Sequence, residues 1–465
     1  MEKRFCTLES ELSQLKKETA QLRKGLNAQV LQLRKANRDL NGEVLSLQKQ
    51  NRDLWNEIFQ LKGPRLIPDI FPHINEALIH DRPTLKSCAL VCRDWHHATR
   101  PLLFRRIVHE EHLTYSGVRK TIDYLPLLRD PLCTIFSHVQ VVQFDGVGSG
   151  FSGFSGLSRV ATFLGHAKKF RVLRRIEFTA MFLDSRNHAL LEGVRHRITE
   201  IELNYTSFQS MRDFTHFVSI FDSLRVLSLY VSAHLPHDLT AFFANSVDLA
   251  RPPPTLGKLC FSCGYGGNFA TAIFQWLYDT QHGLHAMEID WRFSGPEVAE
   301  VFQKYITFLG ASLSELNIAG YLNTFQVALS DAAEVNTGLR QVEIYCAMDF
   351  AAQQLSADER VYLPTSGIPI VAALPPSVEC IRLDIGVWHC DPGGARVWSG
   401  ERWTLLDGIL NGGGKFPALR EVDIMFKRFS TDVDEQLRQV WPQLLPLCAA
   451  KRILKVTVYT PRDFK

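Results

Sequence analysis

Apolar and polar positions follow one another in a block that occurs eleven times from Val139 onward. The block has the form apolar-x-x-apolar-x-apolar, from Val139/Val142/Phe144 in the first copy to Ile453/Val456/Val458 in the last. Polar residues between the apolar ones give the alternation of a short strand with one buried face. The blocks begin 25 to 41 residues apart, which is the spacing of a solenoid built from structural repeats.

Helix-like segments lie between most of the blocks, for example over residues 268–281 and 295–310. A strand, a helix and a further strand in succession predict a parallel sheet with its helices outside. We therefore expect residues 138–465 to form an α/β solenoid, with an ordinary α/β domain as the alternative. Because a solenoid offers a long surface and seldom a reaction centre, the pattern favours recognition over catalysis.

Leucines recur at intervals of seven residues from Leu26 to Leu61. Valine, isoleucine or asparagine stands four residues after each of the first five, and this seam predicts a coiled coil over residues 1–62. The residue types favour a parallel homodimer, whose register the asparagines would fix. A single solvated helix is the alternative. The seam residues that predict dimerisation are Leu33, Asn37, Leu40, Leu47, Asn51 and Leu54.

Charge and composition narrow the class of protein. The net charge is +3, divided as +4 in residues 1–62 and −1 in the remainder, so we expect no nucleic-acid partner. A DNA-reading zipper would also need a dense basic segment before the leucines, which residues 1–11 lack. No apolar run reaches the roughly 18 residues of a membrane span, so we expect no membrane partner. Without a cleavable signal or a disulfide framework, the sequence predicts a cytoplasmic or nuclear protein, or both.

Residues 66–108 predict a compact set of short helices. Pro68 suits the first turn of one helix, and Thr84 suits the N-cap of a second helix that carries Leu85 and Trp95. About forty residues bury little core by themselves. We therefore expect another protein to cover part of the apolar face of this segment.

Three stretches of this segment, LIPDI at 66–70, LVCRDW at 90–95 and RPLLFR at 100–105, resemble an F-box of the kind common in fungal proteins. One departure is Ile67, because the family usually has proline directly after the first leucine. The resemblance implies docking onto the adaptor subunit of an SCF-type (cullin–RING) ubiquitin ligase, with residues 109–137 as a connecting segment. A local helical core beneath the solenoid is the alternative. The implied adaptor-binding residues are Leu66, Pro68, Ile70, Phe71, Ile74, Leu90, Val91, Trp95 and Leu103.

The eleven blocks resemble leucine-rich repeats more loosely. That family places an asparagine eight residues after the first apolar position, and none of the eleven blocks has one. The expected fold is therefore an α/β solenoid of irregular leucine-rich-repeat type, a horseshoe with a parallel sheet. A small all-α F-box and a long coiled-coil helix would precede it.

The polar positions of the predicted strands should face the concave side of the solenoid. At the third, fifth and seventh positions of the blocks, eleven residues are acidic and four are basic. We hypothesise that a basic segment of a target protein binds here, and ordinary solubilising charge is the simpler alternative. The candidate target-binding residues are Glu177, Glu200, Glu202, Tyr230, Glu288, Asp290 and Tyr345.

Motifs of catalysis and cofactor binding are not found in the sequence. Cys260-x-x-Cys263 lacks a second pair at zinc spacing, and the glycine clusters at 148–150 and 412–414 lack the Lys-Ser/Thr of a phosphate loop. We therefore expect neither an enzyme nor a metal or cofactor. The expected function is that of a substrate-recognition subunit of an SCF-type ubiquitin ligase, in contact with its adaptor and cullin. The alternative is a repeat scaffold that recruits no ligase.

Overall fold

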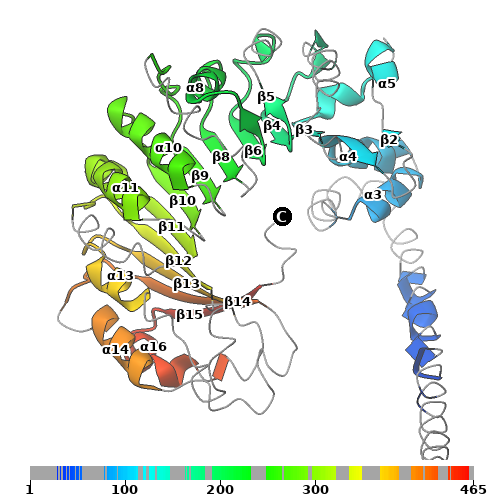
Figure 1. Ribbon diagram of the computed structural model, residues 1–465. Coiled ribbons are helices and arrows are strands. Elements are labelled where there is room, and N and C mark those ends of the chain that lie inside the picture. The colour runs from blue at the N-terminus through cyan, green and yellow to red at the C-terminus, as the bar shows by residue number, and fades with distance from the viewer. Residues whose placement is uncertain are drawn as a thin grey trace, which may run out of the picture. The chain divides into compact units, whose positions relative to one another are not determined.

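Figure 1 shows the chain as a computed structural model, which divides into two units, Met1–Ala98 and Thr99–Lys465. Part of the predicted coiled coil and the opening of the F-box-like segment lie outside the described residues. The structure describes residues 29–54 in part, residue 78, and the ranges 81–91, 93–113, 119–121, 125–130, 133–146, 163, 165–166, 169–183, 191–231, 248–263, 267–291, 296–320, 335–347, 367–386, 400–411, 414–427, 438–439 and 441–459.

Two helices of the F-box-like segment are described, α3 (Arg82–Ala89) and α4 (Arg93–Leu103). The N-cap of α3 is Asp81, whose carboxylate accepts the Thr84 backbone N–H at 3.1 Å and the Thr84 hydroxyl at 2.6 Å. Both bonds lower the pKa of Asp81, and the bond from the Thr84 hydroxyl has the larger effect. The prediction of Thr84 as N-cap was therefore wrong by three positions. Thr84 lies inside the first turn, where its N–H is one of the donors that a cap must satisfy.

A sheet of thirteen strands dominates the second unit, and twelve of them are parallel to their neighbours. The eleven predicted blocks are confirmed as strands, which follow one another across the sheet in chain order. They are β3 (Val141–Asp145), β4 (Arg175–Thr179), β6 (Glu200–Asn204), β8 (Val226–Val231), β9 (Lys258–Cys263), β10 (Ala286–Trp291), β11 (Glu315–Gly320), β12 (Gln341–Ala347), β13 (Cys380–Gly386), β14 (Glu421–Lys427) and β15 (Leu454–Tyr459).

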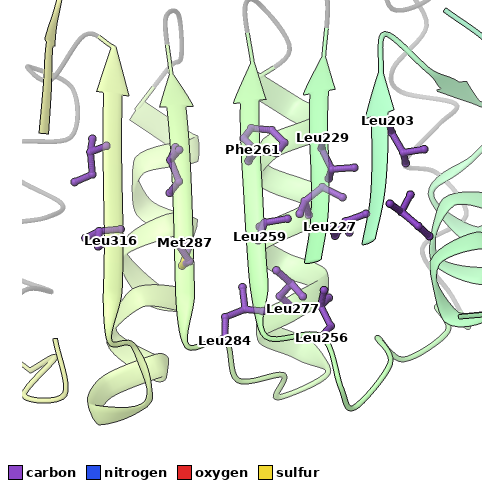
Figure 2. Packing of buried hydrophobic residues seen from close by; sticks show 14 of the residues in the cluster. Leu203, Leu227, Leu229, Leu256, Leu259, Phe261, Leu277, Leu284, Met287 and Leu316 are labelled. Atoms are coloured by element: carbon purple, nitrogen blue, oxygen red, sulfur yellow. The ribbon is translucent and has the colours of Figure 1, made fainter. Parts of the chain in front are cut away.

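The strands are in the same register from one repeat to the next. Leu203, Leu229 and Phe261 occupy equivalent positions on β6, β8 and β9, and their buried side chains pack beside one another (Figure 2). The N–H before each strand of this sheet from β3 to β14 continues the ladder, as in the 2.8 Å bond from Thr199 to the Arg174 carbonyl. Only the last pair departs from the predicted alignment, because Ile424 lies opposite Val456 and not opposite Val458.

Helices cover one face of the sheet (Figure 1), and α10 and α11 confirm the two helices predicted from the sequence. Trp276 and Tyr305, one from each of these helices, are almost fully buried against the strand side chains. The opposite face of the sheet is left to the polar strand positions. The helices on the covered face are α8 (Met211–Ser219), α10 (Gly267–Asp279), α11 (Pro296–Leu309), α13 (Gly367–Ala373), α14 (Gly400–Asn411) and α16 (Pro446–Ala450).

The sheet begins one strand earlier than the blocks predicted. Strand β1 (Arg106–Leu113) pairs in parallel with β3, and β2 (Arg119–Thr121) pairs with β1 in the antiparallel direction. Ile107 lies opposite Val142 and is buried like it. Residues 106–113 therefore belong to the sheet, although the sequence suggested the end of the F-box-like segment and the start of a connecting segment.

Candidate interaction surfaces

The polar strand positions line the sheet face that lacks helices. In the pairing between β4 and β6, Arg175, Glu177 and Thr179 lie opposite Glu200, Glu202 and Asn204 in turn. These are the third, fifth and seventh positions of their blocks, as expected. Like charges directly opposite one another on a sheet destabilise it, so Glu177 and Glu202 need a cation between them.

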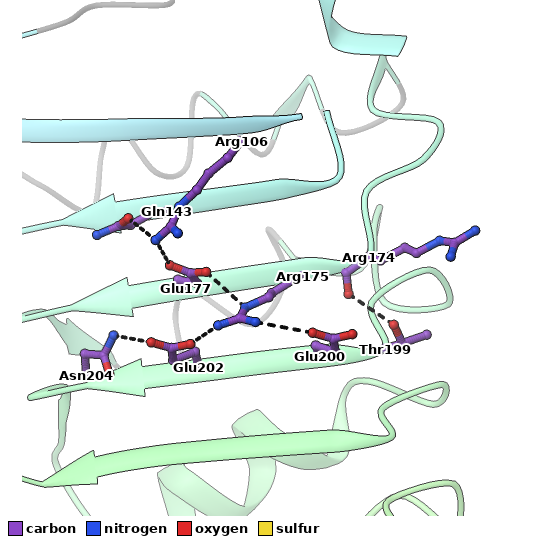
Figure 3. Close-up of polar contacts among 9 residues, drawn as sticks. All are labelled: Arg106, Gln143, Arg174, Arg175, Glu177, Thr199, Glu200, Glu202 and Asn204. Atoms are coloured by element: carbon purple, nitrogen blue, oxygen red, sulfur yellow. Dashed lines mark hydrogen bonds and ion pairs between the residues drawn. The ribbon is translucent and has the colours of Figure 1, made fainter. Parts of the chain in front are cut away.

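Two arginines form ion pairs with these carboxylates (Figure 3). Arg106, from β1, places its Nη2 atom 2.6 Å from Glu177 Oε2, and Arg175 places its Nε atom 2.9 Å from Glu177 Oε1. Arg175 also forms an ion pair with Glu202, and its Nη1 atom lies 3.5 Å from Glu200. Arg106 was not among the residues predicted for this face, because β1 was not predicted. Three strands, β1, β4 and β6, thus contribute to one ion-pair network.

Burial sets the ionisation of this network. Glu177 is only 2% exposed. Burial raises the pKa of Glu177, and the charges of Arg106 and Arg175 offset part of that increase. Burial alone would lower the pKa of Arg175, but the charges of Glu177, Glu202 and Glu200 outweigh it and raise the pKa. Glu177 therefore belongs to the interior of the sheet face and offers no surface to a partner.

The middle of the same face is formed by β8, β9 and β10. Burial raises the pKa of Tyr230 to about 12, and the charge of Glu202 adds to this effect. Cys260 donates to Glu288 at 3.4 Å, and burial, followed by the charge of Glu288, raises the pKa of this thiol to about 11. A thiol with so high a pKa is a poor nucleophile. Lys258 lies 3.5 Å from Glu288, so this carboxylate too has a cation beside it.

The remaining candidate target-binding residues, Asp290 and Tyr345, lie on later strands of the same helix-free face. Asp290 accepts a hydrogen bond from Ser262 of the neighbouring strand at 3.2 Å. Tyr345 of β12 lies opposite Asp384 of β13 in the same row of the sheet. At the last two strands, Lys455 lies 3.4 Å from Glu421 and 3.2 Å from Asp423.

Most of the acidic side chains on this face are therefore paired within the chain. Two of the predicted target-binding acids remain accessible, since Glu200 is 43% and Glu288 49% exposed at the side chain. Glu202 is only 16% exposed. The surface that can meet a partner is thus smaller, and less negative, than the eleven acidic positions alone suggested. Of the described residues on this face, those within 4 Å of a Lys or Arg nitrogen include Glu177, Glu200, Glu202, Glu288, Glu421 and Asp423.

The F-box-like segment presents a different kind of surface. Leu90 and Val91 form the turn after α3, where their N–H groups bond to the Ser87 and Cys88 carbonyls at 3.1 and 3.0 Å. Their side chains are 87% and 66% exposed. Two adjacent exposed apolar side chains on a hydrogen-bonded turn are suited to insertion into a partner's apolar pocket.

Two of the other implied adaptor-binding residues do not join this exposed pair. Trp95 and Leu103, both on α4, are 8% and 9% exposed, so they stabilise the fold and offer no contact surface in this conformation. The five residues of the opening stretch lie outside the described residues; they are Leu66, Pro68, Ile70, Phe71 and Ile74.

Comparison with protein-family models returns no match, and neither does comparison with curated proteins. In the part of the chain that the structure describes, no three His, Cys, Asp or Glu side chains gather closely enough to hold a metal ion. The described helices also lack the length and apolar character that crossing a bilayer requires.

Proposed function

We propose that this protein is a substrate-recognition subunit of an SCF-type ubiquitin ligase. Residues 66–108 would dock onto the adaptor subunit, which connects to the cullin, and the solenoid would hold a target protein. The observation that carries the proposal is the exposed Leu90–Val91 turn, inside the block that most resembles an F-box. Burying both side chains against an adaptor would remove apolar surface from water, at about 25 cal/mol per Å².

The mechanism would be positional. A target held by the solenoid and a ligase held by the F-box-like segment are brought to a high effective concentration, so this chain needs no catalytic group of its own. A long parallel sheet with one face free of helices supports the target-holding half of the proposal. A repeat scaffold that recruits no ligase is the second candidate, since buried Trp95 also fits a purely structural role for α4.

The adaptor-docking half is tested with a Leu90→Asp/Val91→Asp variant of the full chain and a purified adaptor–cullin complex. We expect wild type to bind and the variant to bind at least about tenfold more weakly, because charged groups replace the apolar anchors. Leu405→Asp is the matched control, since Leu405 is 56% exposed on α14, far along the chain from the F-box-like segment. A wild type that binds no adaptor would favour the scaffold.

The target-holding half needs a different substitution. Glu200→Lys/Glu288→Lys reverses the two accessible acids of the helix-free face, and Glu300→Lys makes the same change on α11, where Glu300 is 68% exposed. If a basic segment of the target binds the helix-free face, the first variant loses target capture and the control keeps it. Unchanged capture by both variants would contradict electrostatic recognition and leave these acids a solubilising role.

A further inference from the structure

The N-terminal helix carries an uncovered apolar seam. Each described residue between 29 and 54 is helical, and each is exposed. Leu40 is 59%, Val44 47%, Leu47 63% and Leu54 57% exposed. The steps from Leu40 to Val44 and Leu47 are four and three residues, and Leu54 follows seven residues later, so on a helix these residues form one stripe. An isolated helix with such a stripe is marginal in water, because nothing removes its apolar surface from solvent.

We propose that a second copy of this chain covers the seam, as a parallel two-stranded coiled coil in register. Leucines occupy one core position of the seven-residue repeat, at Leu40, Leu47 and Leu54. The other core position alternates between asparagine and valine, at Asn37, Val44 and Asn51. The leucines occupy the core position called d, and the asparagines and Val44 occupy the core position called a. Leucine at d with β-branched residues at a favours a coiled coil of two helices over one of three or four.

The asparagines identify the occupant as this same chain. In a parallel pair in register, Asn37 faces Asn37 of the other copy and Asn51 faces Asn51, so each amide has an amide partner inside the core. In an antiparallel pair each asparagine would face a leucine, and a slip by one repeat would place it against Val44 or another apolar residue. Either arrangement buries an amide without a hydrogen-bond partner, which costs about 1–3 kcal/mol for each one.

The flanking positions are compatible with the same pairing. From the seven-residue repeat of the sequence alone, Glu43 of one copy would pair with position 48 of the other, a glutamine, and Gln50 with position 55, a tryptophan. Neither pair brings like charges together. Leu45, at 66% exposure, lies outside the a and d positions and therefore remains at the surface of the pair.

A paired helix would make the protein bivalent. Both copies would carry their remaining residues at the same end of a parallel coil, so two solenoids would be tethered together. A target with two identical epitopes would then bind more tightly than a single epitope, by effective concentration alone. This consequence rests on the proposed function, but the pairing itself does not.

The pairing is tested by light scattering on the full chain at micromolar concentration. We expect wild type to have twice the mass of one chain, and Leu47→Glu to weaken self-association by at least about a hundredfold, because a charge replaces a buried d-position leucine. Leu45→Glu makes the same change outside the seam and should keep the double mass. Far-UV circular dichroism and thermal unfolding confirm that the solenoid of each variant is folded.

Orientation is tested by mild oxidation of a Leu40→Cys variant. A parallel pair in register brings the two introduced thiols together and gives a disulfide-linked dimer, whereas a Leu45→Cys variant should give no more dimer than wild type. A monomeric wild type, a trimer or larger mass, or a Leu47→Glu variant of unchanged mass would overturn the proposal. Loss of adaptor binding in the Leu90→Asp/Val91→Asp variant would leave the pairing unaffected, so the two proposals fail separately.

Discussion

Gly338 lies where a side chain cannot fit. It is in the turn before β12, and a Cβ atom there would stand 1.8 Å from the backbone oxygen of Ala311, in the 3₁₀ turn η5 (Gly310–Ser312). A backbone atom cannot rotate away as a side chain can, so one of the two turns must move. We expect Gly338→Ala to lower the free energy of unfolding by about 3 kcal/mol.

Gly408 is the matched control for this substitution, measured in the same urea titrations. It is inside α14, and a Cβ atom there would meet no atom within 4 Å. Because alanine is the better helix former, Gly408→Ala should raise the free energy of unfolding by about 0.5–1 kcal/mol. Equal effects of the two substitutions would contradict the close approach at Gly338.

Glu177 should give stability an unusual pH dependence. Burial raises its pKa in the folded chain above the ordinary value of 4.5, so the folded state holds this proton more tightly than the unfolded state. That contribution is fully present below pH 4.5 and is lost as the pH rises through the folded pKa. The difference in free energy of unfolding between wild type and Glu177→Gln should therefore fall as the pH rises from 4.5 to 7.

The contribution of Glu300 to stability should change with pH in the opposite direction. A hydrogen bond from Lys304 lowers its pKa, so its contribution is present above the unfolded pKa and is lost as the pH falls. Urea titrations extended below pH 4.5 should show the wild-type advantage over Glu300→Gln falling as the pH falls, whereas the advantage over Glu177→Gln falls as the pH rises above 4.5. A wild-type advantage over Glu177→Gln that grows with pH would show that the arginine charges outweigh burial at this site.

The sequence could not predict how deeply Glu177 is buried. Its place on the helix-free face follows from strand alternation, and that part of the prediction was confirmed. Its burial depends on Arg106, which stands 71 residues earlier in the chain. Because β1 was not predicted, the contact of Arg106 with Glu177 could not be foreseen. The ion pairs that neutralise the acidic residues of this face could not be foreseen either.

At the scale of the element, α16 is capped by a residue outside its own segment. Asp407 of α14 is 1% exposed, and its carboxylate accepts the backbone N–H groups of Leu447 at 2.7 Å and Cys448 at 3.0 Å. These are donors of the first helical turn, which begins at Pro446 and has no cap from its preceding residue. Asp407 therefore fixes the position of α16 against α14.

Asp407→Ala removes both acceptors from a buried site. We expect it to lower the free energy of unfolding by about 3 kcal/mol, because a buried N–H group and a part-buried one lose their partners. Asp407→Asn keeps one carbonyl oxygen and should lose about half as much. Thermal unfolding followed by circular dichroism measures both changes. An alanine variant as stable as wild type would mean that water satisfies the two donors.

Strands were predicted correctly where the alternation of apolar and polar residues involves only a few neighbouring positions. Alternation within six residues identified eleven strands, because each strand buries one face against helices next to it in the chain. Strand β1 was missed since His109 takes the place of the third apolar residue, opposite Phe144. The α3 cap was misplaced because both Asp81 and Thr84 suit an N-cap, and only the backbone conformation decides between them.

At the scale of the whole molecule, the solenoid predicts that stability depends on position along the sheet. Each strand pairs with its neighbours in chain order, so a central repeat is held from both sides and an edge strand from one. Val342 on β12 is fully buried, whereas Val456 on β15 is half-buried and packs at the edge of the core. Both residues are valines on the covered face of their strands, which makes them a matched pair.

Val342→Ala should lower the free energy of unfolding by about 2–3 kcal/mol, through lost burial and the cavity left behind. Val456→Ala should cost less than about 1 kcal/mol, because its side chain is already partly hydrated. Hydrogen exchange should show the same gradient, with β15 amides opening locally and β12 amides opening only in larger unfolding events. Equal costs for the two substitutions would mean that the sheet unfolds as one cooperative block, with its last strand held as firmly as its centre.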